Sequence, residues 1–244
     1  MILRIFTLLA AYSYSALSIN AQVTNSLRAE IRMLSFSPDL ALSVAFAQDP
    51  AAQDSVSIPS PIKNYLNHEF STVEFKSRKI AFTKKPDKAS LTREGELIGE
   101  VTLPEGVSSA ILLFLPGNPG AKAACQILSI DDSTRAFPVG SYSAINLSPL
   151  PVRLVLEGKN YDFKAGQHVV IENPPTREGG MIGMRAFAFE KGGWNPIGAQ
   201  LWPSPGQSRN VLVMFLNPES KTVQLRGYDD VPPRTAKAEV QSDP

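Results

Sequence analysis

The sequence predicts an all-β protein, an antiparallel β-sandwich of about ten strands, and three features support this prediction. Apolar and polar residues alternate with a period of two through much of residues 97–228, as in strands with one buried face. Turn signals built on glycine, proline, asparagine and aspartate recur at regular intervals. No segment in this region has the apolar spacing of an amphipathic helix.

The alternation is clearest in residues 137–172. Val152, Leu154 and Leu156 alternate with Arg153 and Glu157, which predicts a strand with one buried face. Residues 157–160 (E-G-K-N) predict a hairpin turn, because glycine and asparagine tolerate positive φ. A return strand begins at Tyr161, and Pro174-Pro175 stops the next one, since proline cannot donate to a ladder.

Two short runs are apolar on both faces. Residues 111–115 (I-L-L-F-L) and 211–216 (V-L-V-M-F-L) contain no polar side chain. Strands of this kind are buried on both sides, so we expect both runs to be central strands of packed sheets. Each is followed by a strong turn signal, at residues 116–120 and 217–220.

The composition excludes some classes of partner. The formal net charge is +1 and 19% of the residues are charged, so no broad field attracts nucleic acid or an anionic membrane. Twenty prolines and sixteen glycines suit a turn-rich β-protein. We therefore expect no nucleic-acid partner.

The N-terminus predicts export. Arg4 precedes an uncharged, largely apolar run at residues 5–19, and Ala21 is a small residue before a first cleavage position. A second position follows Ala45-Phe46-Ala47, which fits the A-x-A pattern. A transmembrane anchor needs about 20 uninterrupted apolar residues, and neither segment has them. We expect an exported, periplasmic or extracellular protein without a stable transmembrane span, and cleavage at Ala21 or Ala47 remains open.

These features divide the chain into four regions. The expected regions are a targeting segment at 1–47, a linker at 48–69, a β-sandwich region at 70–228 and a disordered tail at 229–244. The β-region forms either one domain or two small subdomains, at 70–135 and 136–228.

Cys125 is the only cysteine, so an intramolecular disulfide cannot form. It lies in the apolar run 124–128, which favours a buried core residue over a reactive thiol. We expect no cofactor.

Three segments carry a family resemblance: 136–142 (A-F-P-V-G-S-Y), 145–147 (I-N-L) and 164–166 (K-A-G). They resemble small exported bacterial modules in which an F-P-x-G-x-Y turn leads into one strand and an x-x-G turn into another. They are similar to the immunoglobulin-like domains of unknown function found in cell-envelope proteins. The resemblance implies an immunoglobulin-like sandwich in the cell envelope. Its motifs are mostly turn chemistry, so it brings no catalytic residues.

Motifs for catalysis are missing. No G-x-S-x-G serine elbow occurs, and His68 and His168 lie in neither H-E-x-x-H nor another metal-ligand spacing. Residues 117–122 lack the spacing of a phosphate loop, so they predict a turn. The acidic pairs 131–132 and 229–230 are interpreted as turn residues, with calcium binding as the less favoured alternative. We expect no metal site and no enzymatic activity.

Two functional classes remain. The first is a non-catalytic cell-envelope protein with a structural or protein-interaction role, whose partners are other envelope proteins. The second is a carbohydrate-binding module for a polysaccharide. In that case aromatic rings would stack on sugars, and the candidate ligand-binding residues are Trp194, Trp202, Tyr142 and Tyr161. At least two of these rings should then be exposed and coplanar.

Overall fold

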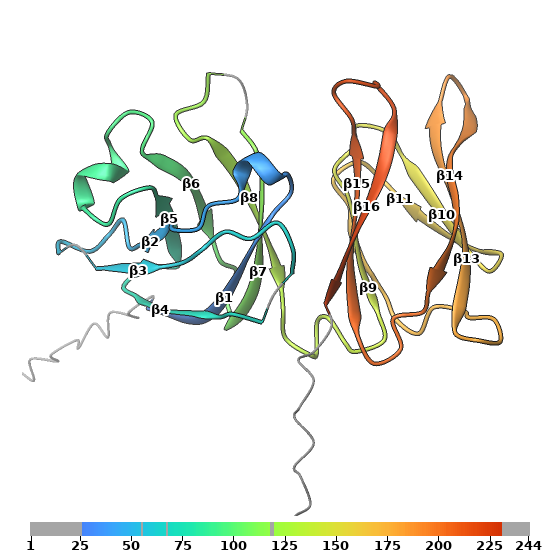
Figure 1. Ribbon diagram of the computed structural model, residues 1–244, viewed down its shortest axis with the longest axis horizontal. Helices are drawn as coiled ribbons and strands as arrows, with labels where there is room; N and C mark the ends of the chain where they lie inside the picture. The colour runs from blue at the N-terminus through green and yellow to red at the C-terminus, as the bar shows by residue number, and fades with distance from the viewer. Residues whose placement is uncertain (1–25, 55, 67, 118–119, 231–244) are drawn as a thin grey trace, which may run out of the picture.

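The computed structural model describes residues 26–54, 56–66, 68–117 and 120–230. This part of the chain is all-β, with 52% strand and 3% helix in four mostly antiparallel sheets. The expected number of ten strands is wrong, because sixteen are present and β1 to β5 precede residue 97. The strands form two lobes that lie side by side (Figure 1).

The N-terminal lobe contains β1 to β8 and two 3-10 helices. Its strands are β1 (Leu27–Ser35), β2 (Phe46–Gln48), β3 (Ser57–Pro59), β4 (Ser71–Phe75), β5 (Lys79–Thr83), β6 (Leu97–Thr102), β7 (Ser109–Pro116) and β8 (Cys125–Asp131), and the helices are η1 (Pro38–Leu40) and η2 (Lys88–Leu91). The C-terminal lobe contains β9 to β16. They are β9 (Tyr142–Asn146), β10 (Val152–Leu156), β11 (Lys159–Phe163), β12 (His168–Ile171), β13 (Met181–Glu190), β14 (Gly193–Pro203), β15 (Arg209–Leu216) and β16 (Val223–Asp230).

Both lobes connect their strands in the same order. The N-terminal lobe has sheets β4-β1-β7-β8 and β3-β2-β5-β6. The C-terminal lobe has β12-β9-β15-β16 and β11-β10-β13-β14, which is the same order eight strands later. In both lobes the first strand pairs in parallel with the seventh, as β1 with β7 and β9 with β15. The chain therefore contains one eight-strand unit twice.

Three hydrophobic cores hold the four sheets together. One core lies between the two sheets of the N-terminal lobe and another between the two sheets of the C-terminal lobe. The third, the interlobe core, joins the sheet of β1, β7 and β8 to the sheet of β9, β15 and β16. Its buried members are Leu34, Leu66, Ile111, Leu113, Ile130, Phe137, Ile145, Val211, Val213 and Tyr228. The two inner sheets are thus covered on both faces.

The interlobe core explains the two doubly apolar runs. On β7, Leu112 packs in the core of its own lobe while Ile111 faces the other lobe. On β15, Met214 packs in the core of its own lobe and Val213 faces the other lobe. All four side chains have an exposed fraction of 0%. The prediction that both runs are buried on both faces is confirmed, and the second face is covered by the other lobe.

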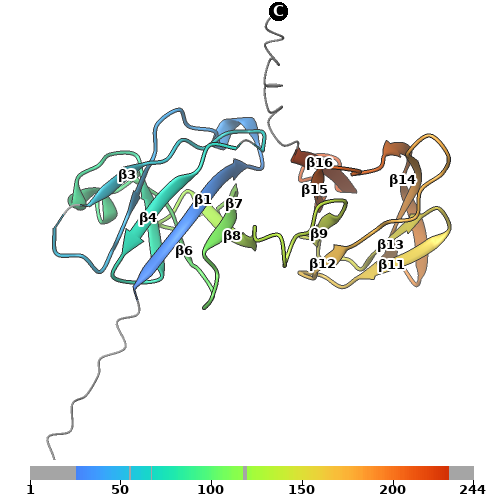
Figure 2. The same ribbon diagram turned by 90° about the horizontal axis from the view of Figure 1, so that it is seen from below.

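The connection between the lobes contains the F-P-V-G-S-Y segment (Figure 2). Phe137 at its start is buried in the interlobe core, and Tyr142 at its end is buried in the C-terminal lobe. Gly140 has a φ of +81°, in the left-handed region that glycine adopts without strain, and its N–H donates to Ser208 O at 2.8 Å. The segment therefore anchors the connection to both lobes.

The structure differs from the expected targeting segment. Residues 27–35, which the sequence placed inside it, form β1 between β4 and β7. Cleavage after Ala47 would remove β1 and leave both neighbours without their shared partner. Of the two cleavage positions, only Ala21 keeps this fold intact, and residues 1–25 lie outside the described part.

The expected linker and tail also differ from the structure. Within 48–69, Ser60, Ile62 and Leu66 are buried and residues 57–59 form β3. The apolar residues here are too sparse for a periodic signal, so the sequence did not reveal their burial. At the other end, Asp229 and Asp230 belong to β16, whereas residues 231–244 lie outside the described part.

Within the described residues, no helix is long and apolar enough to cross a membrane. Cys125 is 5% exposed and packs in the core of the N-terminal lobe, so its expected burial is confirmed. Burial raises the pKa of its thiol, which makes the nucleophilic thiolate scarce at neutral pH.

Candidate functional site

The two acidic pairs of the sequence meet at the interface between the lobes. Arg32 on β1 lies between one aspartate of each pair. Its Nε and Nη2 donate to Asp132 at 2.9 and 2.8 Å, and its Nη1 and Nη2 donate to Asp230 at 2.8 and 3.0 Å. The three side chains are at most 2% exposed. One guanidinium thus joins the end of β8 to the end of β16.

Arg209 makes a second bridge from the C-terminal lobe. Its Nε donates to Asp230 at 2.9 Å and its Nη2 donates to Asp132 at 2.8 Å. Its Nη1 donates to the backbone oxygens of Asp132 and Phe137, and its guanidinium lies 4.6 Å from the centre of the Phe137 ring. Each arginine therefore contacts an aspartate of its own lobe and one of the other lobe. We call these two arginines and two aspartates the interlobe ion cluster.

The contacts in the cluster favour the charged forms of Asp230 and Arg32 although both side chains are buried. Burial alone would raise the pKa of Asp230, but hydrogen bonds and charge from Arg32, together with Arg209, lower it below its usual range. Burial alone would lower the pKa of Arg32, and the two carboxylates raise it instead. His68 adds a further polar neighbour, with Nε2 at 3.4 Å from Asp230 Oδ1.

The two aspartates occupy equivalent positions in the two lobes. Asp132 directly follows β8 and Asp230 ends β16, the eighth strand of each unit. The sequence carries the repeat as C-Q-I-L-S-I-D-D at 125–132 and V-Q-L-R-G-Y-D-D at 223–230. This repeat is the sequence signal that pairs the two aspartates, and the alternation within single strands does not reveal it.

The cluster is suited to holding the lobes together. All four carboxylate oxygens of Asp132 and Asp230 accept hydrogen bonds from arginine, so the oxygens that calcium would need are already occupied. Among the described residues, no group of three or more histidine, cysteine or acidic side chains could hold a metal ion. Truncating one partner would leave a buried charge uncompensated. The cluster therefore fixes the orientation of the lobes.

A groove lies at the other end of the same interface. It encloses about 660 Å³ between the end of β1 and β7 on one side and the β15–β16 hairpin on the other. Apolar side chains line its floor, and Leu216 is 38% exposed there. The interlobe groove is lined by Phe36, Ser37, Asp39, Leu115, Pro116, Gln126, Leu147, Phe215, Leu216, Asn217, Pro218, Glu219 and Arg226.

Arg226 organises the aromatic wall of this groove. Its guanidinium lies 4.7 Å from the centre of the Phe36 ring and 5.4 Å from that of Phe215. The two rings meet edge to face at 4.7 Å, and Arg226 also donates to the backbone oxygen of Phe36. Because Phe36 belongs to one lobe and Phe215 to the other, the wall keeps its shape only while the lobes keep their orientation.

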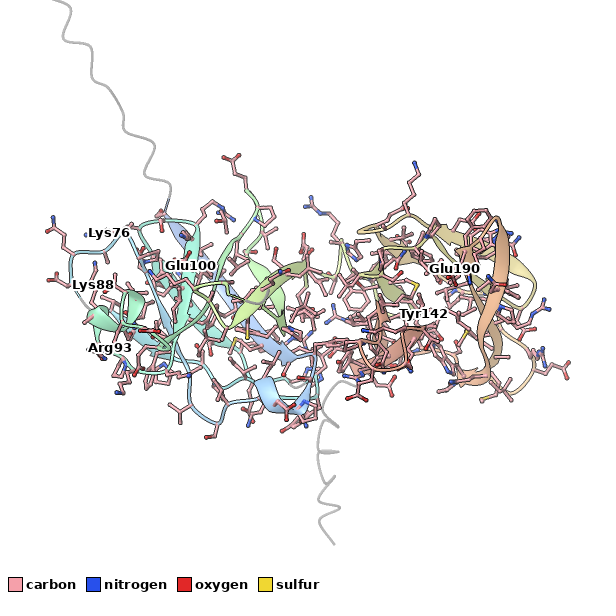
Figure 3. The ribbon with its side chains drawn as sticks, turned by 90° about the horizontal axis from the view of Figure 1, so that it is seen from above. Lys76, Lys88, Arg93, Glu100, Tyr142 and Glu190 are labelled. Atoms are coloured by element: carbon pink, nitrogen blue, oxygen red, sulfur yellow. The ribbon has the colours of Figure 1, made fainter. Side chains whose placement is uncertain are left out.

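The structure brings together two of the four predicted aromatic residues. Tyr142 and Trp202 line a cleft of about 270 Å³ at the edge of the C-terminal lobe, where β14 approaches β16. Their ring centres are 6.2 Å apart and their planes are inclined by 50°. Tyr142 is 1% exposed and lies among the side chains inside the lobe (Figure 3), and its hydroxyl donates to Pro203 O at 3.2 Å. Only the Trp202 ring is therefore available to a ligand.

The other two predicted rings lie elsewhere. Trp194, near the start of β14, packs against Phe189, and the Arg153 guanidinium lies 4.4 Å from the centre of its ring. Tyr161 on β11 packs against the core of the C-terminal lobe, beside Lys159. The four rings form no single flat face, and ligand binding by them remains a prediction.

Of the two histidines, His168 lies beside a buried serine. His168 is exposed, and its Nε2 lies 2.8 Å from Ser143 Oγ. Ser143 is 0% exposed, so its hydroxyl cannot meet a substrate. The geometry gives this pair a structural contact between β12 and β9.

One prediction follows from the cleft. Burial, and then the negative charge of Asp229, raise the pKa of Tyr142 to about 12. A spectrophotometric pH titration should therefore show that the wild type and Tyr142→Phe give the same tyrosinate signal near pH 10, where an ordinary tyrosine ionises. The curves should separate only toward pH 12, and Asp229→Asn should move that separation to lower pH. If the curves separated near pH 10, Tyr142 would be accessible to solvent.

No protein-family model matches the chain, and a search of curated proteins finds no similar sequence. The function must therefore be inferred from the sites themselves. These are the interlobe ion cluster, the interlobe groove and the cleft beside Trp202.

Proposed function

We propose that the protein is a non-catalytic, exported cell-envelope protein that binds other proteins, and that each lobe is an immunoglobulin-like β-sandwich. The facing sheets of each lobe and the F-P-x-G-x-Y resemblance support this assignment. The apolar segment at residues 5–19, with cleavage at Ala21, supports export to the periplasm or beyond. The burial of Cys125 and Ser143 supports a role without nucleophilic catalysis.

The observation that carries the interaction role is the interlobe groove. Its walls come from both lobes, so the ion cluster at the opposite end of the interface pre-forms it. Pre-formed surfaces bind with a smaller loss of conformational freedom. Phe36, Phe215 and Leu216 are only partly covered, as expected for a site that receives an apolar anchor from a partner.

Charge at the rim indicates what the partner carries. The carboxylates of Asp39 and Glu219 line the groove, and within the described residues neither one accepts a hydrogen bond or joins an ion pair. Against the single positive charge of Arg226, the two acids leave the groove net negative. Beside its apolar side chains, this charge complements a polypeptide segment with a bulky apolar residue next to lysine or arginine. We therefore infer that the partner is an envelope protein with such a segment.

Peptide binding tests this function. The probes are a short fluorescent peptide with phenylalanine between lysines and its counterpart with glutamates, and fluorescence anisotropy is measured against the full chain. We expect the lysine peptide to bind and the glutamate peptide not to bind. Leu216→Ser should weaken binding, and Asp39→Asn with Glu219→Gln should also reduce its dependence on salt.

Leu201→Ser is the matched control, because Leu201 is an exposed leucine of the same lobe that does not line the interlobe groove. It should leave binding unchanged. Failure of the lysine peptide to bind, or equal effects of Leu216→Ser and Leu201→Ser, would contradict the proposed function.

A further inference from the structure

The cleft beside Trp202 is a second pocket, formed by the C-terminal lobe alone. It lies between the inner side of β14 and the ends of β15 and β16. Its residues are Tyr142, Gln200, Trp202, Pro203, Asn210, Leu212, Leu225, Gly227 and Asp229, none of which lines the interlobe groove. It therefore requires a separate functional explanation.

The polar side chains of Gln200, Asn210 and Asp229 line this cleft. Asn210 donates its amide N–H to the Asp229 carboxylate, which fixes the orientation of the amide. Its Oδ1 is then buried and has no hydrogen-bond partner among the described residues. Because this oxygen is closed to solvent, the Asn210 amide orients the Asp229 carboxylate and leaves that carboxylate as the acceptor that a ligand can reach. Asp229 is exposed and adds a carboxylate to the same cleft.

The apolar part of the cleft is the Trp202 indole. Its Nε1 donates to Gln200 Oε1 at 2.7 Å, which holds the ring at the edge of the cleft. An aromatic face next to hydrogen-bond acceptors is complementary to a molecule with one apolar face and several hydroxyl donors. A pyranose ring has this arrangement, with C–H groups on its face and hydroxyls around its edge.

We propose that this cleft binds one neutral sugar residue of a glycan, with the sugar face on Trp202 and its hydroxyls donating to the exposed Asp229 carboxylate. The Asp229 carboxylate disfavours uronic acids and other anionic sugars by repulsion. Tyr142 is buried and inclined to Trp202, so no coplanar pair exists along which a chain of sugars could stack. The ligand is thus a single residue held in a pocket.

A small substitution at Gly227 should narrow the pocket without disturbing the fold. A Cβ at this position would lie 3.4 Å from Asn210 Oδ1 and 3.5 Å from Leu212 Cδ2, both ordinary contacts. Gly227→Ala should therefore fold normally while it fills the space beside the unpaired acceptor. Asn195→Ala is the control, because Asn195 is exposed on β14 and does not line the cleft.

Tryptophan fluorescence of the full chain tests the proposal. In a Trp194→Phe background Trp202 is the only tryptophan, so its emission reports on the cleft. We expect saturable changes in this emission with glucose, galactose, mannose or N-acetylglucosamine. We expect none with the anionic sugar glucuronate or with the small cation methylammonium. Gly227→Ala should weaken binding by about tenfold or more, which corresponds to at least about 1.4 kcal/mol, and Asn195→Ala should not weaken it.

Four results would overturn this inference. They are no response to any of the neutral sugars, equal responses to glucuronate, a saturable response to methylammonium, and unchanged binding in Gly227→Ala. Because the groove peptides contact neither Trp202 nor Gly227, peptide binding and sugar binding can fail independently.

Discussion

Replacement of Asp230 by asparagine is expected to lower the free energy of unfolding by about 3–5 kcal/mol, the usual cost of removing one partner from a buried ion pair. Asparagine keeps the size of the side chain but removes its charge. Arg32 and Arg209 would then share one carboxylate, that of Asp132, at a site with almost no solvent. Chemical denaturation at neutral pH measures the loss.

The control is Asp162→Asn, because Asp162 pairs with Arg153 on the surface of the C-terminal lobe. Solvent screens such a pair, so its loss should matter far less. Equal losses of unfolding free energy in Asp230→Asn and Asp162→Asn would contradict a stabilising role for the buried interlobe ion cluster.

The difference in the free energy of unfolding between the wild type and Asp230→Asn should depend on pH in a defined direction. The pKa of Asp230 is lower in the folded protein than in the unfolded chain, so its contribution is complete above the unfolded value of about 3.9 and is lost as pH falls through the folded value. The stability gap between wild type and Asp230→Asn should therefore be constant near neutrality and shrink below about pH 4. A stability gap that shrank as pH rose would contradict a lowered pKa of Asp230 in the folded protein.

Aspartate at either Val213 or Met214 is expected to unfold the protein or separate its lobes. Both side chains are fully buried, and an unpaired buried carboxylate costs several kcal/mol against a total stability of about 5–15 kcal/mol. The two variants should fail differently. Met214→Asp disrupts the core of the C-terminal lobe, whereas Val213→Asp disrupts the interlobe core.

Thr222→Asp is the control, since Thr222 is exposed just before β16. It should change stability by no more than about 0.5 kcal/mol in thermal unfolding. If Met214→Asp were as harmless as Thr222→Asp, β15 could not be a strand with two buried faces.

The sequence predicted the strands of the described part better than their assembly. Alternation and turn signals located most of the strands from β6 to β16, though not β9, because these signals depend only on neighbouring residues. The runs around Ile111 and Val213 showed that two strands are buried on both faces. They did not show what covers the second face, since an apolar run looks the same whether a second sheet or another lobe packs on it.

The candidate sites were predicted less well, because they join residues far apart in the chain. Arg32 is separated from Asp132 by 100 residues and from Asp230 by 198, and no local pattern links them. The repeated Asp-Asp ending was the one usable signal. Among the aromatic residues, residue type alone could not separate the pair Tyr142 and Trp202 from Trp194, which lies under Arg153.

The ion cluster is better explained by orientation than by net stability. Buried ion pairs often add little stability relative to apolar side chains of the same size, because desolvation offsets much of their attraction. The interlobe core already supplies apolar contact between the lobes. The four charged groups add a geometric requirement, since both arginines bond to both aspartates in only one arrangement of the lobes. That arrangement is the one that forms the interlobe groove.

The most direct test of this account is the distribution of distances between the two lobes in solution. Spin labels at Lys76→Cys and Glu190→Cys, in a Cys125→Ala background, mark opposite lobes at exposed positions (Figure 3). Pulsed electron paramagnetic resonance should give one narrow distribution of distances between the labels when the ion cluster is intact. The distribution should be broader when Asp230→Asn is added. A broad distribution with the cluster intact would contradict the central claim that the ion cluster locks the two lobes into one rigid body.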